Sequence, residues 1–228
     1  IDVLLGDSVH TPAEEDHFYT ERVVRFAPDY ICYRPPPYVP PVVTHLPARA
    51  MTFGCFSEVT KIGPSSIALW AAVLRAVPDA RFLINNHLLA DEQRQARITR
   101  MFVEAGIGSE RLIYRTGAPH PEFLAQYASV DAILDTAPYS GGLTTCEALL
   151  MGVPVLTITG ERFCGRHATA HLLHGGYPEG VARTVEELVT KAKALATDAA
   201  GRATLRSSLR PRFLEASTFQ SFPSRTQT

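Results

Sequence analysis

Hydrophobic and polar residues follow a regular alternation along most of the chain. From residue 51 onward, short apolar runs are separated by longer segments whose apolar residues recur every three or four positions, such as Ile67, Trp70 and Leu74. The short runs predict buried strands, and the periodic segments predict amphipathic helices. The predicted strands cover residues 51–56, 81–84, 111–114, 131–135 and 153–158, and the predicted helices cover 65–77, 91–105, 121–128, 144–151, 166–173 and 184–197. Single helices between consecutive strands predict an α/β fold, a doubly wound parallel sheet with helices on both faces.

The first fifty residues show a different pattern. A buried apolar strand is predicted at residues 1–5, and because no initiator methionine precedes it, it indicates a fragment that begins inside a fold. Residues 21–26 alternate like a second strand. The sequence Thr11-Pro-Ala-Glu14 matches a capping box with proline at the first helical position, which predicts a short helix. Five of the seven residues from 35 to 41 are proline, which excludes helix and favours an extended linker.

These patterns divide the chain into three predicted parts. Residues 1–46 are expected to be a remnant of another lobe with its linker, and residues 47–215 to be the main lobe. Residues 216–228 are predicted to be a disordered tail.

Composition narrows the class of protein. The 22 Lys and Arg residues against 23 Asp and Glu residues give a net charge of −1, which argues against nucleic acid as a partner. No apolar run approaches the roughly 18–20 residues that span a bilayer, and the N-terminus lacks the layout of a signal peptide, so a cytoplasmic protein without a membrane partner is predicted. The four cysteines form no CxxC pair, which favours reduced thiols over zinc ligands.

The loop at residues 136–147 is the most informative candidate site. In doubly wound sheets, ligands bind beyond the carboxyl ends of the strands. This loop passes Gly141-Gly142 and enters a predicted helix through Leu143-Thr144-Thr145, so backbone N–H groups and hydroxyl groups there could bind a phosphate. Glu147 would lie in the first helical turn, where its carboxylate could accept hydrogen bonds from a ribose. An ordinary loop with threonine caps and a dipole-stabilising glutamate explains the same residues equally well.

Lys61 is a second candidate, because it follows the predicted strand at residues 51–56 and is one of only three lysines. A lysine in this loop can reach a diphosphate as a compact point charge. The alternative is a solvated surface lysine.

Three histidines share one face of the predicted helix at residues 166–173. His167 and His171 have the i, i+4 spacing of metal ligands, and His174 follows one turn later. Acidic residues near them in the sequence are limited to Glu161 and Glu179, and no Asp-x-Asp-like pair follows any predicted strand. We therefore interpret them as polar helix-face residues and predict no metal cofactor.

Several motifs occur in a fixed order between about Leu4 and Leu209. They are Tyr19-Thr-Glu-Arg-Val, Tyr33-x-Pro-Pro36, Phe53-Gly-Cys-Phe56, Lys61-Ile62, Leu69-Trp70, Leu134-Asp-Thr136, Gly141-Gly142, Thr144-Thr145-Cys-Glu-Ala-Leu149, Met151-Gly-Val-Pro-Val155 and Gly160-Glu161. With these motifs, the chain resembles the catalytic region of the O-linked N-acetylglucosamine transferase and SPINDLY family.

The resemblance implies the Rossmann-like C-terminal lobe of a GT-B glycosyltransferase, with a remnant of the N-terminal lobe. By analogy, Lys61 would contact the donor diphosphate and act in catalysis. Gly142, Leu143 and Thr144 would also contact the diphosphate, Glu147 would hold the ribose, and Ala118 would read the base with Phe123 near it. The expected donor site also includes Glu58, His120, Gly141 and Thr145. Three of these residues differ from the family pattern. Leu143 occupies a position that is threonine in many members. Glu147 and His120 occupy positions that are aspartate and lysine, respectively, in the animal enzymes.

The implied function is the donor-binding part of an inverting, metal-independent protein O-glycosyltransferase. Its partners would be UDP-N-acetylglucosamine and a serine or threonine of a protein or peptide. Relatives also use GDP-fucose or UDP-glucose, and tetratricopeptide repeats usually precede the catalytic region. Because most of the first lobe is missing, the chain alone is expected to transfer no sugar. The alternatives are a non-catalytic module that binds a nucleotide or a partner, and an oxidoreductase, which the lack of a glycine fingerprint disfavours.

Overall fold

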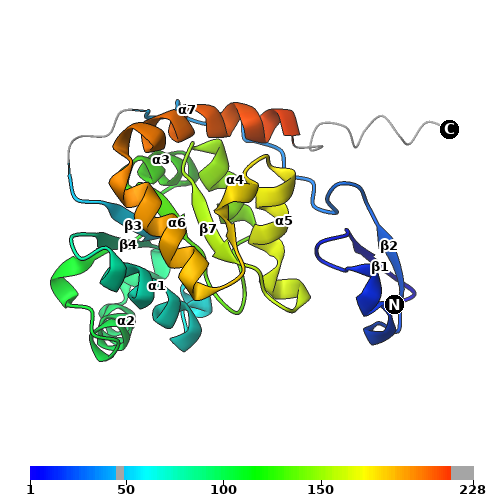
Figure 1. The fold of residues 1–228 in the computed structure, drawn as a ribbon, viewed down its shortest axis with the longest axis horizontal. Helices are drawn as coiled ribbons and strands as arrows, with labels where there is room; N and C mark the ends of the chain where they lie inside the picture. The colour runs from blue at the N-terminus through cyan, green and yellow to red at the C-terminus, as the bar shows by residue number, and fades with distance from the viewer. Residues whose placement is uncertain (45–48, 217–228) are drawn as a thin grey trace.

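A six-stranded parallel sheet forms the centre of the molecule. The computed structural model describes residues 1–44 and 49–216 (Figure 1). The strand order is β5-β4-β3-β6-β7-β8, and all the pairings are parallel. The strands are β3 (Thr52–Cys55), β4 (Arg81–Asn85), β5 (Leu112–Arg115), β6 (Ala132–Leu134), β7 (Val155–Ile158) and β8 (Val181–Ala182). The sheet confirms the predicted doubly wound α/β class.

Helices cover both faces of the sheet. On one face are α1 (Pro64–Ala76), α2 (Glu92–Glu104) and α6 (Val185–Thr197), and on the other are α3 (His120–Ala125), α4 (Leu143–Leu150), α5 (His167–His174) and α7 (Ala199–Ala216). Side-chain alternation along the strands explains the two cores, because Phe82 and Ile84 of β4 face the first layer and Leu83 the second. The first core is centred on Trp70, whose Nε1 donates to the carbonyl of Asp135 at 2.9 Å.

The strand order places a topological switch point between β3 and β6. The chain leaves β3 toward β4 and β5, then returns to the other side of β3 to form β6, β7 and β8. The loops after β3 and β6 therefore diverge at this point, which leaves a crevice outside the carboxyl ends of the strands. Short 3-10 helices occur in the connections: η1 (Ala13–Phe18), η2 (Val59–Lys61), η3 (His87–Ala90), η4 (Ser109–Arg111), η5 (Gln126–Ser129), η6 (Phe163–Gly165) and η7 (Pro178–Gly180).

The N-terminal residues form a separate small sheet. Strands β1 (Val3–Gly6) and β2 (Arg22–Arg25) pair in parallel, and Figure 1 shows them beside α5, at the end of the molecule opposite α1 and α2. Two expectations for this segment are wrong. Leu5 is half exposed (51%) in a thin two-stranded sheet, so the first strand is not buried. Thr11 does not cap a helix, because its hydroxyl donates to the carbonyl of Asp7 at 2.9 Å and Pro12 precedes η1 instead.

Helix α7 and strand β8 were not predicted. The buried residues of α7 are Arg206, Leu209 and Phe213, so a charged residue occupies a core position and the apolar periodicity is weak. Arg206 donates to the carbonyls of Val43 and Val130 at 3.0 and 2.8 Å, which fixes the proline-rich linker against the lobe. The predicted division at residue 46 and the predicted tail beyond Ala216 lie outside the described residues.

The remaining predicted elements match the structure to within a residue or two at each end, except that the helix expected at residues 121–128 is divided into α3 and η5. Within the described ranges, no helix is both long and apolar enough to cross a membrane.

Candidate functional site

A cavity of about 360 Å³ lies at the switch point, beyond the carboxyl ends of the strands. The segments that follow β3, β4, β5 and β6 line it. Nine of the eleven predicted site residues line this cavity. They are Glu58, Lys61, Ala118, His120, Phe123, Gly142, Leu143, Thr144 and Glu147. Gly141 and Thr145 do not line the cavity. Both are buried behind it, where the Thr145 hydroxyl donates to the carbonyl of Gly141 at 3.0 Å.

Lys61 lies at the end of η2 and is half-buried rather than solvated. Its Nζ atom donates to the carbonyl of Ser140 at 2.9 Å and lies 3.9 Å from the centre of the Tyr139 ring. Burial lowers the pKa of the Lys61 amine, and the nearby Asp135 carboxylate opposes this shift. The amine is therefore fixed at the mouth of the loop that leads into α4.

Asp135 shapes that loop from within the protein. Its Oδ1 atom accepts the backbone N–H groups of Thr136 and Gly141 at 2.8 and 2.7 Å, and its Oδ2 atom accepts the Thr157 hydroxyl at 2.7 Å. Complete burial raises the pKa of Asp135, and these hydrogen bonds oppose the shift. The carboxylate thus acts on the backbone of the loop and does not line the cavity.

Glu147 is a buried carboxylate on the inner wall of the cavity, with 2% of its surface exposed. Its Oε1 atom lies 2.8 Å from Nε2 of His120, and its Oε2 atom accepts the Tyr127 hydroxyl at 3.4 Å. Burial raises the pKa of Glu147, and the hydrogen bond from His120 opposes the shift. The linker residue Tyr38 contacts Nδ1 of His120 at 3.0 Å, so the linker reaches the edge of the site.

Aromatic rings form an apolar wall behind Glu147. Phe56 stacks on Tyr127 at a centroid distance of 4.2 Å and contacts Phe123 edge-to-face at 5.4 Å. Phe56 and Phe123 line the cavity. Such rings offer planar surfaces on which a nucleotide base can stack.

The sequence indicated the loops but missed five of the residues that line the cavity: Phe56, Ser57, Asn86, His87 and Gly117. Gly117 has a φ of +77°, and a Cβ atom there would lie 3.0 Å from the backbone nitrogen of His87. Two loops therefore approach each other closely at a glycine, a pattern that is visible only when both loops are placed in space.

The three histidines of α5 are not polar residues on a solvent-exposed face. His171 is buried and its Nδ1 atom lies 3.2 Å from Oδ2 of Asp29, while His174 Nδ1 lies 3.5 Å from the same oxygen. His167 is 8% exposed and contacts His10. The acidic partners come from the N-terminal segment, which the spacing in the sequence could not reveal.

Comparisons with known proteins agree with this architecture. The family model described as glycosyl transferase family 41 matches residues 42–224. A probable UDP-N-acetylglucosamine–peptide N-acetylglucosaminyltransferase SPINDLY from Solanum lycopersicum is 32% identical over 216 residues, which cover 92% of this chain and 23% of the relative. The Hordeum vulgare SPINDLY protein is 33% identical over 215 residues, with the same coverage of 92% and 23%. The chain thus spans about a quarter of the length of these relatives.

Solved structures show the same fold. A mutant of the Thermobaculum terrenum O-GlcNAc transferase is 38% identical, with a TM-score of 0.88, and the match covers 96% of this chain and 42% of that protein. A sucrose-phosphate synthase from Thermosynechococcus elongatus shares the fold at 14% identity, with a TM-score of 0.62 and coverage of 94% and 54%. The chain therefore belongs to glycosyl transferase family 41, and its main lobe is the Rossmann-like C-terminal lobe of the GT-B architecture.

Proposed function

We propose that this chain is the donor-binding part of an inverting protein O-glycosyltransferase that transfers N-acetylglucosamine from UDP-N-acetylglucosamine to serine or threonine. One observation carries the proposal. A single cavity at the switch point combines a fixed amine, the N-terminus of a helix, a buried carboxylate and an aromatic wall. These are the groups that would recognise a diphosphate, a ribose and a base.

The diphosphate would lie between Lys61 and the start of α4. The carbonyl of Gly142 accepts the first hydrogen bond of the helix, from Thr145 at 3.0 Å. The N–H groups at Leu143 and Thr144 precede that bond and are free to donate to phosphate oxygens. When the bond to the sugar breaks, negative charge develops on the diphosphate, and Lys61 and these N–H groups stabilise it without a metal ion.

The ribose hydroxyl groups would donate to Glu147, and the base would lie near Ala118 and Phe123. His120 holds the Glu147 carboxylate from one side, which leaves its remaining lone pairs for a diol. The acceptor hydroxyl would attack the anomeric carbon on the face opposite the diphosphate, which gives inversion. The SPINDLY relatives and the Thermobaculum enzyme, through the transferase activities in their names, support N-acetylglucosamine as the sugar.

Calorimetric titration of this chain with UDP, UDP-N-acetylglucosamine, GDP and GDP-fucose tests the proposal. We expect UDP and its sugar derivative to bind, and both to bind more tightly than the guanosine pair. Tighter binding of GDP and GDP-fucose would reassign the donor within the same site. Failure of all four to bind would show that the cavity is not a donor site. Binding by the chain without transfer by the full-length protein would favour a non-catalytic module.

A further inference from the structure

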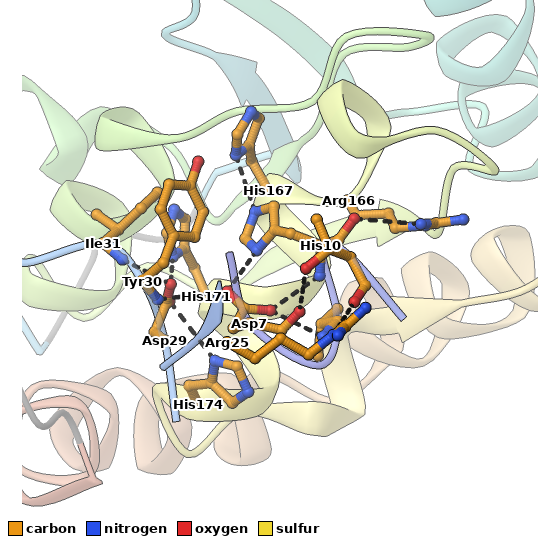
Figure 2. Close-up of polar contacts among 12 residues, drawn as sticks. Asp7, His10, Arg25, Asp29, Tyr30, Ile31, Arg166, His167, His171 and His174 are labelled. Atoms are coloured by element: carbon orange, nitrogen blue, oxygen red, sulfur yellow. Dashed lines mark hydrogen bonds and ion pairs between the residues drawn. The ribbon is translucent and has the colours of Figure 1, made fainter. Parts of the chain in front are cut away.

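Three titratable side chains form a continuous hydrogen-bonded chain where the N-terminal segment meets α5. Figure 2 shows Asp7, His10 and His167 in line, with the His167 ring extending away from Asp7. Nδ1 of His10 lies 2.7 Å from Oδ2 of Asp7, and Nε2 of His10 lies 2.9 Å from Nδ1 of His167. Asp7 and His10 are fully buried, so neither exchanges these partners for water.

The charge of Asp7 determines which nitrogens carry protons. Its Oδ1 atom accepts the backbone N–H groups of Val9 and His10, both at 2.8 Å. Burial raises the pKa of Asp7, but the hydrogen bonds from His10 outweigh it and the net shift is downward. An ionised Asp7 requires His10 to donate from Nδ1. A neutral His10 then accepts at Nε2 from Nδ1–H of His167, which leaves Nε2 of His167 without a proton.

The outer end of the chain lies beside Tyr139, in the loop that leads into α4, and not in the wall of the cavity itself. His167 is the first residue of α5, and its ring lies 5.8 Å from the ring of Tyr139. Lys61 lies 3.9 Å from the centre of the same Tyr139 ring. Within the described part of the chain, Nε2 of His167 has no hydrogen-bond partner. An unprotonated ring nitrogen is therefore held beside the loop that carries the proposed diphosphate contacts.

Other charged groups surround the pair. The His10 ring also contacts Tyr30 at 4.8 Å and His171 at 6.2 Å, and His171 bonds Asp29. Burial, together with the charges of His10, His171 and Lys61, lowers the pKa of His167 to about 4, and the charge of Asp29 opposes this shift. His167 alone is thus a poor site for a positive charge, whereas His10 lies against the Asp7 carboxylate.

We propose that Asp7, His10 and His167 form a proton relay for sugar transfer, with His167 as the catalytic base and Asp7 and His10 as positioning residues. This inference rests on the proposed function. The acceptor oxygen forms a bond to the anomeric carbon, and the bond from that carbon to the diphosphate oxygen breaks with its electron pair. The hydroxyl proton moves to Nε2 of His167, and the proton on Nδ1 of His167 moves to Nε2 of His10. The positive charge then lies on His10 beside Asp7, in the manner of a carboxylate–histidine pair.

A bound cation is the competing explanation for part of this cluster. Asp7, Asp29 and His174 each present one possible ligand atom, and these atoms lie within 4.8 Å of one another. Both carboxylates, however, already accept hydrogen bonds from histidines and from backbone N–H groups. Both carboxylates are therefore satisfied without an ion, whereas the buried Nδ1 atom of His174 has no hydrogen-bond partner within the described residues. The relay accounts for the alignment of Asp7, His10 and His167 toward Tyr139.

Nitrogen NMR on the unmodified chain tests the relay without any substitution. Long-range proton–nitrogen spectra at pH 7.5 distinguish the two neutral tautomers of each ring. We expect the proton of His10 on Nδ1 and the proton of His167 also on Nδ1. A proton on Nε2 of His167 would overturn the proposal, because that nitrogen could not then accept one.

Kinetics of the full-length protein provide the second test. We expect His167→Gln to lower kcat by at least about 100-fold and His10→Gln by about tenfold, with UDP affinity unchanged within about twofold. The acidic limb of the pH–rate profile should disappear in His167→Gln when rates are compared only at pH values at which circular dichroism shows both proteins to be folded, because loss of stability in acid cannot then produce the limb. His171→Gln is the control, because His171 is also buried on the same helix but bonds Asp29 and not a member of the relay.

The outcomes separate this inference from the proposed function. Normal kcat and an intact acidic limb in His167→Gln would overturn the relay and leave the transferase proposal unaffected. UDP binding without transfer by the unmodified full-length protein would instead contradict both. Loss of activity with EDTA and recovery with Zn²⁺, abolished in Asp29→Asn, would assign the cluster to a cation and overturn the relay.

Discussion

Two buried carboxylates of the lobe differ in what they face. Asp135 is enclosed by three protein donors and supports the loop backbone. Glu147 has a histidine on one oxygen and a distant tyrosine hydroxyl on the other, and it lines the cavity. A buried carboxylate with unused lone pairs that faces a cavity is a candidate for ligand binding. Asp135 is fully satisfied and needs no ligand.

Glu147→Gln should weaken binding of UDP by about 1.5–3 kcal/mol, the range for hydrogen bonds to charged groups. Glutamine keeps the shape of the side chain but removes the charge that would accept two ribose hydroxyl groups. Titration of the variant and the unmodified chain with UDP and 2′-deoxy-UDP measures the effect. The unmodified chain should bind 2′-deoxy-UDP more weakly than UDP, whereas the variant should bind the two ligands with nearly the same affinity. Equal losses in both proteins would place the ribose elsewhere.

At the residue scale, the sequence predicted which residues share the cavity better than it predicted the contact partners of each residue. Loops that follow strands were predictable, and Lys61, Gly142 and Glu147 reach one cavity because all parallel strands end at one edge. The contact of His120 with Glu147 and that of His10 with His167 join segments far apart in the sequence. Periodicity carries no information on such pairs. The roles of the predicted site residues stay predictions.

At the element scale, α7 is packed closely against the end of α4. Gly152 follows α4 with a φ of +70°, and a Cβ atom there would collide with the backbone carbonyl of Arg206 in α7. Gly106 after α2 has a similar φ of +80°, but nothing lies near the position of its missing Cβ. The two glycines differ in whether a helix crosses over them.

Gly152→Ala should therefore be more destabilising than Gly106→Ala. An alanine whose backbone is in the left-handed region lowers the free energy of unfolding by about 1–2 kcal/mol. The Gly106→Ala variant measures this cost alone. Gly152→Ala must also displace α7, which adds at least about 2 kcal/mol, as overpacking does in a filled core. Urea denaturation of both variants gives the comparison. Equal losses would contradict the docked position of α7.

Prediction from sequence succeeded where apolar periodicity is strong and failed where polar residues are buried. The helix at Pro64–Ala76 has Trp70, Ala71 and Leu74 in the core, and its limits were predicted closely. In α7, the buried Arg206 replaces an apolar residue, and Gly201 and Pro211 read as helix breakers. Tertiary hydrogen bonds from Arg206 to Val43 and Val130 compensate, and no local pattern encodes them.

At the scale of the whole molecule, the N-terminal segment is attached to the lobe through buried polar contacts. His167 joins His10, and His171 and His174 hold Asp29. Burial raises the pKa of Asp29, but the hydrogen bonds from these histidines outweigh it and lower the pKa well below its ordinary value. These contacts depend on which groups carry protons, so the attachment should respond to pH.

Acidification from pH 6.5 to pH 4 should destabilise the chain. The pKa of His167 falls from 6.5 in a free side chain to about 4 in the folded protein. The unfolded state therefore binds more protons in this window, and stability is lost as pH falls. The difference corresponds to about 3 kcal/mol. The pKa of Asp29 is also lower in the folded protein, so stability falls further once the pH drops below the pKa that this carboxyl group has in the unfolded chain. Denaturation of His167→Gln should lack most of the loss between pH 6.5 and 4, and the exposed control His17→Gln should retain it.

Nucleotide binding should not depend on divalent cations. In the proposed site, Lys61 and the N-terminus of α4 supply the positive potential that a metal ion would otherwise provide. Titration with UDP in EDTA and in Mg²⁺ or Mn²⁺ should give the same affinity. A large gain with the cation would contradict this assignment.

The central claim is that the cavity beside Lys61 binds a nucleoside diphosphate, and calorimetry of Lys61→Ala with UDP tests it most directly. The substitution removes one hydrogen bond to Ser140, so folding should lose only about 1 kcal/mol. UDP binding should weaken by about 1.5–3 kcal/mol, while Lys193→Ala, which removes an exposed lysine of α6, should bind UDP normally. A folded Lys61→Ala protein that binds UDP as tightly as the unmodified chain would contradict the account.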